Sequence, residues 1–243
     1  MKDKASELVF NQSVFWYQEF YSSRNVTKIV NDISVTLGIE PTDSIIDFGC
    51  GCGDITNGLS QYAKSVTGYD VSVEMIKRAK ENFPNMLFFS NRSDLFNRRF
   101  DKGVAFFHVA NYIFAQRSIK SFVNDISALI VRGGKFAFDF WSPEAVHLKG
   151  LESREAHFVV KDVQYLRKVV PRIHQLNNVK IEITIQASNT GEIIQRESHD
   201  LRIASDEEIK VAADELGLSI EFCHWPSDDK IELPWTRVAL ITF

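Results

Sequence analysis

The chain has 243 residues, of which 44% are hydrophobic and 25% are charged, and this composition predicts one large globular domain or one domain with an insertion. A net charge of −4 argues against a broad electrostatic contact with nucleic acid, and the longest apolar runs, such as residues 104–107, are too short to span a membrane. A polar N-terminal segment and three cysteines without a disulfide pattern favour a cytoplasmic protein.

The first part of the chain alternates between helical and strand patterns. We expect helices at 8–37, 55–62, 72–82 and 116–131, the last of them ending at Gly133 and Gly134. Short apolar segments predict strands at 44–48, 65–69, 86–89, 103–107 and 135–140. Strands that alternate with helices indicate a mainly parallel sheet with right-handed crossovers.

The pattern changes near residue 150 to extended segments. An antiparallel insertion is expected over 151–204, with strands at 159–170, 178–187 and 193–203 and a hairpin turn at 189–191. Ser205 and Glu208 have the spacing of a capping box and predict a helix over 206–216. Two strands, at 218–224 and 236–243, complete the chain.

These elements predict a Rossmann-like, doubly wound α/β fold. Its sheet has seven mostly parallel strands, of which the last is antiparallel, and the antiparallel insertion precedes the last helix. We expect residues 1–150 and 205–243 to form the main domain with an N-terminal helical lid, and residues 151–204 to form the insertion.

A glycine-rich loop marks the candidate cofactor site. The strand at 44–48 leads into Gly49, Gly51 and Gly53, at alternate positions, and a helix follows. Glycine lets the backbone turn tightly and approach a ligand closely, and the helix presents its N-terminal amides at the same place. Asp70 ends the second strand, where a carboxylate can accept hydrogen bonds from ribose hydroxyls. This order of elements is more specific than the glycines alone.

Two classes of cofactor compete for this loop. A dinucleotide site needs its third glycine one residue after Gly53, where the chain has Asp54, and a carboxylate is unfavourable beside a pyrophosphate. Asp47 instead suits a ligand with a cationic amino group, which it would bind directly or through water. A structural turn with a chance acid is the remaining alternative.

The segment from Asp47 to Gly53, together with Asp70, resembles the first motif and the ribose-binding acid of the class I S-adenosylmethionine-dependent methyltransferases. The resemblance covers about residues 42–140 and implies S-adenosylmethionine as the cofactor. Met75 would pack against the adenine, and Asn91 stands where the family usually has an acid. The cofactor-binding residues that the resemblance implies are Tyr17, Tyr21, Asp47, Gly49, Gly51, Gly53, Asp70, Val71, Met75, Asn91, Arg92 and Phe107.

Three further segments, 15–21, 138–141 and 197–202, resemble bacterial enzymes that methylate sugars, including nucleotide-linked amino sugars. This resemblance implies a small polar acceptor, a sugar or nucleotide-linked sugar, with nitrogen and oxygen methylation both open. The implied acceptor-binding residues are Trp141, Glu197, His199 and Arg202, with Arg154, Arg167 and Arg172 as additions. A solvated charged strand face is the alternative.

Two residues are candidates for the chemistry. Methyl transfer needs an aligned nucleophile, and a hydroxyl nucleophile also needs a base. His108 follows the fourth strand and is the candidate base, because histidine changes its charge near neutral pH; a hydrogen-bonded histidine at a strand end is the alternative. Tyr17 and Tyr21 share a helical face, and the resemblance implies that Tyr21 reaches the reacting centre. Packing alone is their alternative role.

Other functions stay open at this stage. The rivals are a methyltransferase acting on a macromolecule, a noncatalytic S-adenosylmethionine-binding module and a dinucleotide oxidoreductase. Residues 108–111 lack the prolines typical of nucleic-acid amino methylases, so we expect no nucleic-acid partner and no membrane partner, and a homodimer is left open. Cys50 and Cys52 have no second ligand pair, so no metal site is expected.

Overall fold

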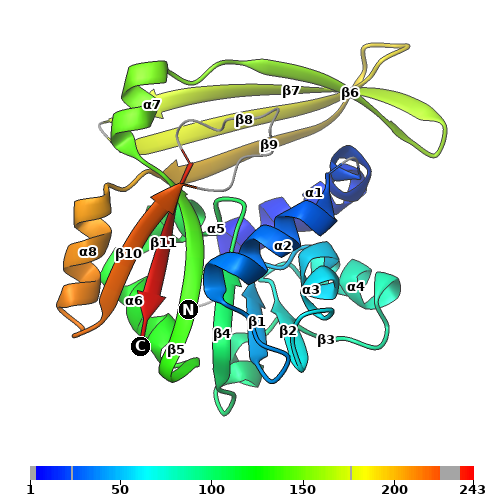
Figure 1. Cartoon of the computed structure of the whole chain (residues 1–243). Helices are drawn as coiled ribbons and strands as arrows, with labels where there is room; N and C mark the ends of the chain where they lie inside the picture. The colour runs from blue at the N-terminus through cyan, green and yellow to red at the C-terminus, as the bar shows by residue number, and fades with distance from the viewer. Residues whose placement is uncertain (1–3, 23, 176, 225–235) are drawn as a thin grey trace.

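A computed structural model describes residues 4–22, 24–175, 177–224 and 236–243 (Figure 1). Over these residues the main sheet has seven strands in the order β10-β11-β5-β4-β1-β2-β3. The strands are β1 (Ser44–Phe48), β2 (Ser65–Tyr69), β3 (Leu87–Phe89), β4 (Phe100–Ala105), β5 (Ile130–Trp141), β10 (Ser219–His224) and β11 (Thr236–Thr242). Strand β11 pairs antiparallel with β5 and β10, and the other pairs are parallel. The predicted Rossmann-like fold is confirmed.

Helices cover both faces of this sheet. The helices of the described residues are α1 (Lys4–Tyr21), α2 (Val26–Leu37), α3 (Asp54–Leu59), α4 (Val73–Asn82), α5 (Val109–Gln116), α6 (Ile119–Ser127), α7 (Pro143–Lys149) and α8 (Asp206–Asp214), with a 3-10 turn at Arg92–Leu95, and of these α1 and α7 contact the second sheet. Successive strand side chains point to opposite faces. Ile45 therefore packs with α2 and α3, whereas Ile46 packs with α5, α6 and α8. Burial on both faces explains why the neighbouring residues Ile45 and Ile46 of β1 are both apolar.

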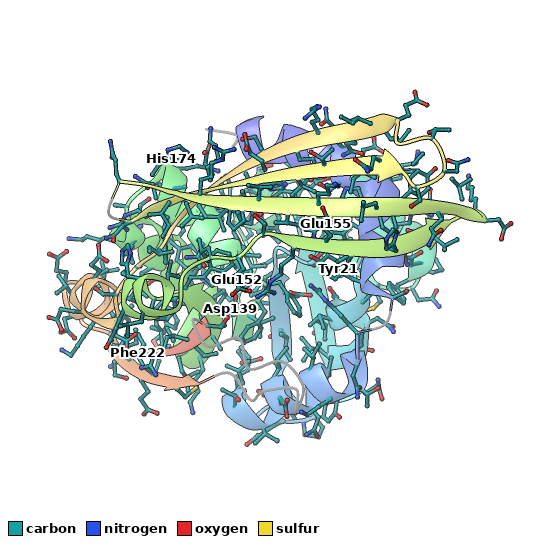
Figure 2. All side chains as sticks on the ribbon, turned by 90° about the horizontal axis from the view of Figure 1, so that it is seen from above. Tyr21, Asp139, Glu152, Glu155, His174 and Phe222 are labelled. Atoms are coloured by element: carbon teal, nitrogen blue, oxygen red, sulfur yellow. The ribbon has the colours of Figure 1, made fainter. Side chains whose placement is uncertain are left out.

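The insertion forms a second sheet. Its strands β6 (Arg154–Val160), β7 (Val163–His174), β8 (Asn178–Ala187) and β9 (Ile193–Arg202) pair antiparallel in chain order. Figure 1 shows this sheet lying across the end of the main sheet at which β5 finishes. In Figure 2 the same sheet is seen from above, with Tyr21 labelled beside its β6 edge. Helix α1 packs against it through Trp16.

The local signals for helix capping and the hairpin turn are confirmed. Ser205 and Glu208 form both hydrogen bonds of the capping box at the start of α8. The amide of Gly191 donates to the carbonyl of Ala187 (2.8 Å), which closes the turn between β8 and β9.

Two of the predicted helices are wrong in extent. The helix expected at 8–37 is interrupted after Tyr21, because the Asn25 side chain accepts from the amide of Lys28 (3.0 Å) and begins α2. The helix expected at 116–131 is preceded by α5 and ends at Ser127. Gly133 and Gly134 lie inside β5, where the pairing with β4 shifts register, and a Cβ on Gly134 would meet the Asp101 carbonyl at 2.5 Å. These glycines permit a bulge and do not end a helix.

The insertion also differs from its predicted segments. The stretch at 159–170 is a hairpin and not one strand, because Lys161 and Asp162 both have positive φ angles (47° and 65°) and turn the chain between β6 and β7. Consecutive left-handed residues match the right-handed twist of a hairpin. Helix α7 was not predicted. None of the helices in the described part of the chain is long and apolar enough to cross a bilayer.

Candidate active site

A cavity of about 1370 Å³ lies at the carboxyl ends of the central strands, walled by α1, α5 and the second sheet. Pockets for single small ligands usually occupy about 300–1,000 Å³, so this one has room for two molecules. Most predicted site residues line it: Tyr17, Tyr21, Asp47, Gly49, Gly51, Asp70, Val71, Met75, Asn91, Arg92, Phe107, His108, Trp141 and His199. Gly53, Glu197 and Arg202 are not among the lining residues.

The loop glycines serve different purposes. All three have positive φ, 85° at Gly49, 53° at Gly51 and 90° at Gly53. A Cβ on Gly49 would lie 2.4 Å from Val109, and one on Gly53 would lie 2.8 Å from the Phe88 ring. At Gly51 the nearest atom, on the Tyr17 ring, is 3.7 Å away. Gly49 and Gly53 are therefore fixed by packing, whereas Gly51 opens toward the cavity.

Asp70 is held in place by the loop it faces. One carboxylate oxygen accepts from the amide of Gly51 (2.9 Å), and the other accepts from the amide of Ser72 (2.9 Å). Burial raises the pKa of the Asp70 carboxyl, and these two backbone hydrogen bonds oppose that shift. Each oxygen has a second lone pair, so the oriented carboxylate can still accept hydrogen bonds from a ligand in the cavity.

Asp47 sits deeper, at the end of β1. The hydroxyl of Thr56 donates to it (2.6 Å). Burial raises the pKa of Asp47 to about 7; the Thr56 hydrogen bond lowers it, and the nearby Asp70 raises it further. A buried carboxyl of this kind favours a cationic partner, which would restore the charged form.

Asn91 and Arg92, which the resemblance places at the cofactor, form hydrogen bonds and ion pairs with other residues of the protein. The Asn91 side chain accepts from the amide of Ser93 (3.2 Å) and caps the 3-10 turn. Arg92 is paired with Asp125 on α6, which also binds Arg117. Met75 is among the residues that line the cavity and contacts Cys52, but at 1% exposure little of its side chain is open to a ligand.

His108 stands in an unusual turn after β4. Phe107 and His108 both have positive φ (65° and 68°), which ends the strand before the predicted residue 107. The amide of His108 donates to Asp139 (2.8 Å) and holds this turn. Trp141 donates its indole N–H to Nε2 of His108 (3.3 Å). Nδ1 lies 3.2 Å from the Asp139 carboxylate, but its angle makes no hydrogen bond within the described residues.

This geometry favours the alternative of a hydrogen-bonded histidine at a strand end. The lone pair of Nε2 faces the Trp141 indole, and Nδ1 faces Asp139, so both ring nitrogens of His108 are directed at protein groups. A general base needs a free lone pair within reach of the proton it takes. Asp139, which the sequence did not single out, is the residue that shapes this turn.

The aromatic face of α1 closes one side of the cavity. The rings of Tyr17 and Tyr21 meet edge to face, with centroids 4.7 Å apart. Burial raises the pKa of Tyr17 to about 12, an effect that Arg24 opposes. The guanidinium of Arg24 lies 3.6 Å from the centre of the Tyr21 ring and 4.1 Å from that of Phe107. One face of the Tyr21 ring is therefore already covered by the Arg24 guanidinium.

The second sheet contributes a buried polar chain. Glu197 and His199 share a face of β9, as their spacing predicts, and are joined by a hydrogen bond of 2.9 Å. The other ring nitrogen of His199 lies 3.0 Å from the hydroxyl of Tyr112 on α5, which lines the cavity. Trp16 donates its indole N–H to Glu197 (2.8 Å). Tyr112 was not predicted as a site residue, although it follows His108 by one helical turn.

The predicted arginines divide between the cavity and the surface. Arg167 lines the cavity, with its guanidinium 4.8 Å from the Trp16 ring centre, and its buried Nε has no hydrogen-bond partner among the described residues. Arg202 pairs with Glu208 at the start of α8, outside this cavity, and Arg172 pairs with Glu182 on exposed strand faces. No cluster of three potential metal ligands is found in the described parts of the chain.

Comparison with known proteins identifies the domain type. Residues 45–134 match the family model described as "Methyltransferase domain". The "23S rRNA (uracil(1939)-C(5))-methyltransferase RlmD" of Francisella tularensis is 38% identical over 73 residues, which are 27% of this chain and 16% of that protein. The chain spans less than a third of the length of the curated relatives it matches.

Solved structures match over nearly the whole length. An S-adenosylmethionine-dependent methyltransferase from Clostridium acetobutylicum superposes with a TM-score of 0.73 at 20% identity, covering 94% of this chain and 96% of that one. CalS10, an amino pentose methyltransferase from Micromonospora echinaspora, gives 0.74 at 15% identity over 93% and 95%. The predicted methyltransferase fold is thereby confirmed, including the second sheet.

Proposed function

We propose that this chain, which carries a methyltransferase domain over residues 45–134, transfers a methyl group from S-adenosylmethionine to a small polar acceptor, a sugar or nucleotide-linked sugar. One observation carries the proposal. The glycine loop and the oriented carboxylate of Asp70 occupy one side of a cavity that continues beneath the second sheet, where polar side chains gather. In this assignment residues 1–150 and 205–243 hold the cofactor, and residues 151–204 wall the acceptor.

The residues present fit the cofactor. Asp70 would accept the ribose hydroxyls, Asp47 would face the amino group, and Met75 would pack against the adenine. Bound here, S-adenosylmethionine supplies an electrophilic methyl group on a sulfonium centre. The protein contributes orientation and the exclusion of water, because the loop, α1 and the second sheet surround the cavity.

The acceptor side supports a small and polar molecule. Trp141, His199 and Arg167 line the cavity, and the Nε of Arg167, which has no hydrogen-bond partner among the described residues, suits an anionic or hydroxyl-rich group. CalS10, which shares the fold, is an amino pentose methyltransferase. The rRNA methyltransferase match covers only 27% of this chain, and the net charge of −4 disfavours a nucleic-acid acceptor.

Calorimetry on the purified chain tests the cofactor. We expect S-adenosylmethionine and S-adenosylhomocysteine to bind and NAD to bind at least about 100-fold more weakly, because Asp54 occupies the position where a pyrophosphate needs glycine. Tight binding of NAD without binding of S-adenosylmethionine would overturn the proposal.

The raised pKa of Asp47 predicts a proton linked to cofactor binding. Below pH 7 the buried carboxyl of the free protein is mostly protonated, and an arriving ammonium group favours the carboxylate. Binding of S-adenosylmethionine should therefore release nearly one proton at pH 6 and fewer as the pH rises through 7. The affinity for S-adenosylmethionine should rise with pH over the same range.

Titrations in buffers of different ionisation enthalpy measure the released proton. The matched variant Asp47→Asn has no carboxyl to titrate and should release none at pH 6. Equal proton release by the two proteins would show that Asp47 does not face the bound amino group.

A further inference from the structure

The chain of hydrogen bonds from Glu197 through His199 to Tyr112 has a definite direction. Glu197 is 5% exposed, and its oxygens receive the N–H groups of Trp16 and Gln195 as well as the contact from His199. A carboxylate in this setting only accepts, so Nε2 of His199 must carry a hydrogen. In the neutral imidazole, Nδ1 then has the free lone pair, and the Tyr112 hydroxyl donates to it.

Tyr112 lines the cavity, as His199 does, and is the end of the hydrogen-bond network opposite Glu197. Asn111 fixes the start of α5 by donating to the carbonyl of Arg202 (2.8 Å) and accepting from the amide of Trp141 (3.1 Å). Burial raises the pKa of the Tyr112 phenol well above its ordinary value, which keeps it neutral. The titratable and charged groups that face it are Tyr17 and Tyr21 on α1, Arg167 on β7, and Glu197 and His199 on β9.

When a neutral phenol donates its hydrogen to a histidine, the lone pairs on its oxygen can still accept a hydrogen bond from another group. An acceptor hydroxyl or amine in the cavity is such a donor. Because Tyr112 can give its own proton to Nδ1 of His199 while it takes one from the acceptor, it need never become a phenolate. The imidazolium that results would lie 2.9 Å from the Glu197 carboxylate, which stabilises it.

We propose that Tyr112, His199 and Glu197 form the proton relay for methyl transfer, an inference that rests on the proposed function. The acceptor oxygen or nitrogen forms its bond to the methyl carbon while the carbon–sulfur bond breaks and its electron pair goes to sulfur. The acceptor proton passes to the oxygen of Tyr112, the hydroxyl proton of Tyr112 passes to His199, and solvent later removes it. Tyr112 is the catalytic residue, and His199 and Glu197 act through it.

A purely structural role for the same hydrogen bonds makes different predictions. If the network only ties β9 to α5 and α1, removing the Tyr112 hydroxyl weakens folding and cofactor binding together with turnover. If it is a relay, turnover falls while S-adenosylhomocysteine affinity and the dependence on acceptor concentration stay unchanged.

The test uses the full chain, methyl-labelled S-adenosylmethionine and the small-molecule fraction of a cell extract as acceptor. Tyr112→Phe and His199→Gln should transfer label about 10²–10⁴-fold more slowly than the parent chain, the usual loss for a missing proton acceptor. Tyr62→Phe and His157→Gln, which change residues outside the cavity, should keep the parent rate. Affinity for S-adenosylhomocysteine should stay within about threefold of the parent in every variant.

A second readout does not depend on turnover. Nitrogen NMR of the histidine rings should show hydrogen on Nε2 of His199 and an accepted hydrogen bond at Nδ1 that Tyr112→Phe removes. A parent-like rate in Tyr112→Phe, or hydrogen on Nδ1 of neutral His199, overturns the relay alone. If Tyr112→Phe loses S-adenosylhomocysteine affinity along with its rate, the network is structural. A parent chain that transfers no label overturns the proposed function itself.

Discussion

Replacing Asp70 by alanine should weaken S-adenosylmethionine binding by about 1–3 kcal/mol, roughly 5- to 150-fold, which is the usual cost of losing hydrogen bonds to a charged group. The loss has two physical sources. The carboxylate no longer accepts from the ribose, and the amides of Gly51 and Ser72 lose the partner that fixes the loop. Calorimetry at constant pH and salt measures the change.

Asp94→Ala is the matched control for this substitution. It removes an exposed acid of the neighbouring 3-10 turn, and Asp94 itself does not line the cavity, so cofactor affinity should stay within about twofold. Circular dichroism establishes that both variants fold. If Asp70→Ala binds as tightly as Asp94→Ala, the adenosine half of the cofactor does not lie at this carboxylate.

The largest loss of stability should follow Glu197→Ala. The buried carboxylate holds the N–H groups of Trp16, Gln195 and His199, and its removal leaves them unpaired away from water. Breaking a buried network of this kind costs about 3–5 kcal/mol. For a chain of this length, that corresponds to a fall in Tm of roughly 6–20 °C.

The neighbouring strand offers a control. Glu182 on β8 is about half exposed and pairs with Arg172 on the surface, so Glu182→Ala should change the free energy of unfolding by less than about 0.5 kcal/mol. Thermal or urea unfolding of the two variants side by side measures the difference. Equal Tm values would mean that Glu197 contributes no more to stability than a solvated carboxylate.

Local patterns predicted the elements that hold the cofactor. Strands β1 and β2 lie at the residues expected for them, and the last four residues of each are buried within the parallel sheet. The capping box at Ser205 was equally visible, since its two hydrogen bonds join residues three apart. The glycine pattern and Asp70 identified the loop, although Gly53 packs against Phe88 and does not line the cavity.

The acceptor side depends on contacts between distant segments, which periodicity does not encode. Tyr112 and His199 are 87 residues apart, and Trp141 and His108 are 33 apart. Arg202 is on the same strand as His199, but its side chain points to the opposite face of β9. It therefore pairs with Glu208 and does not line the cavity. The hairpin turn at Lys161 and Asp162, where both φ angles are positive, was not predicted. Neither residue type marks such a turn as strongly as glycine or asparagine.

Transfer of labelled methyl groups tests the central claim most directly. The purified chain is incubated with methyl-labelled S-adenosylmethionine and a whole-cell extract, and mass spectrometry follows the label in the small-molecule, RNA and protein fractions. The proposed function predicts a labelled small polar metabolite, formed only when the chain is present and lost in Asp70→Ala at limiting cofactor. Label that enters RNA or protein, with none in the small-molecule fraction, would contradict it.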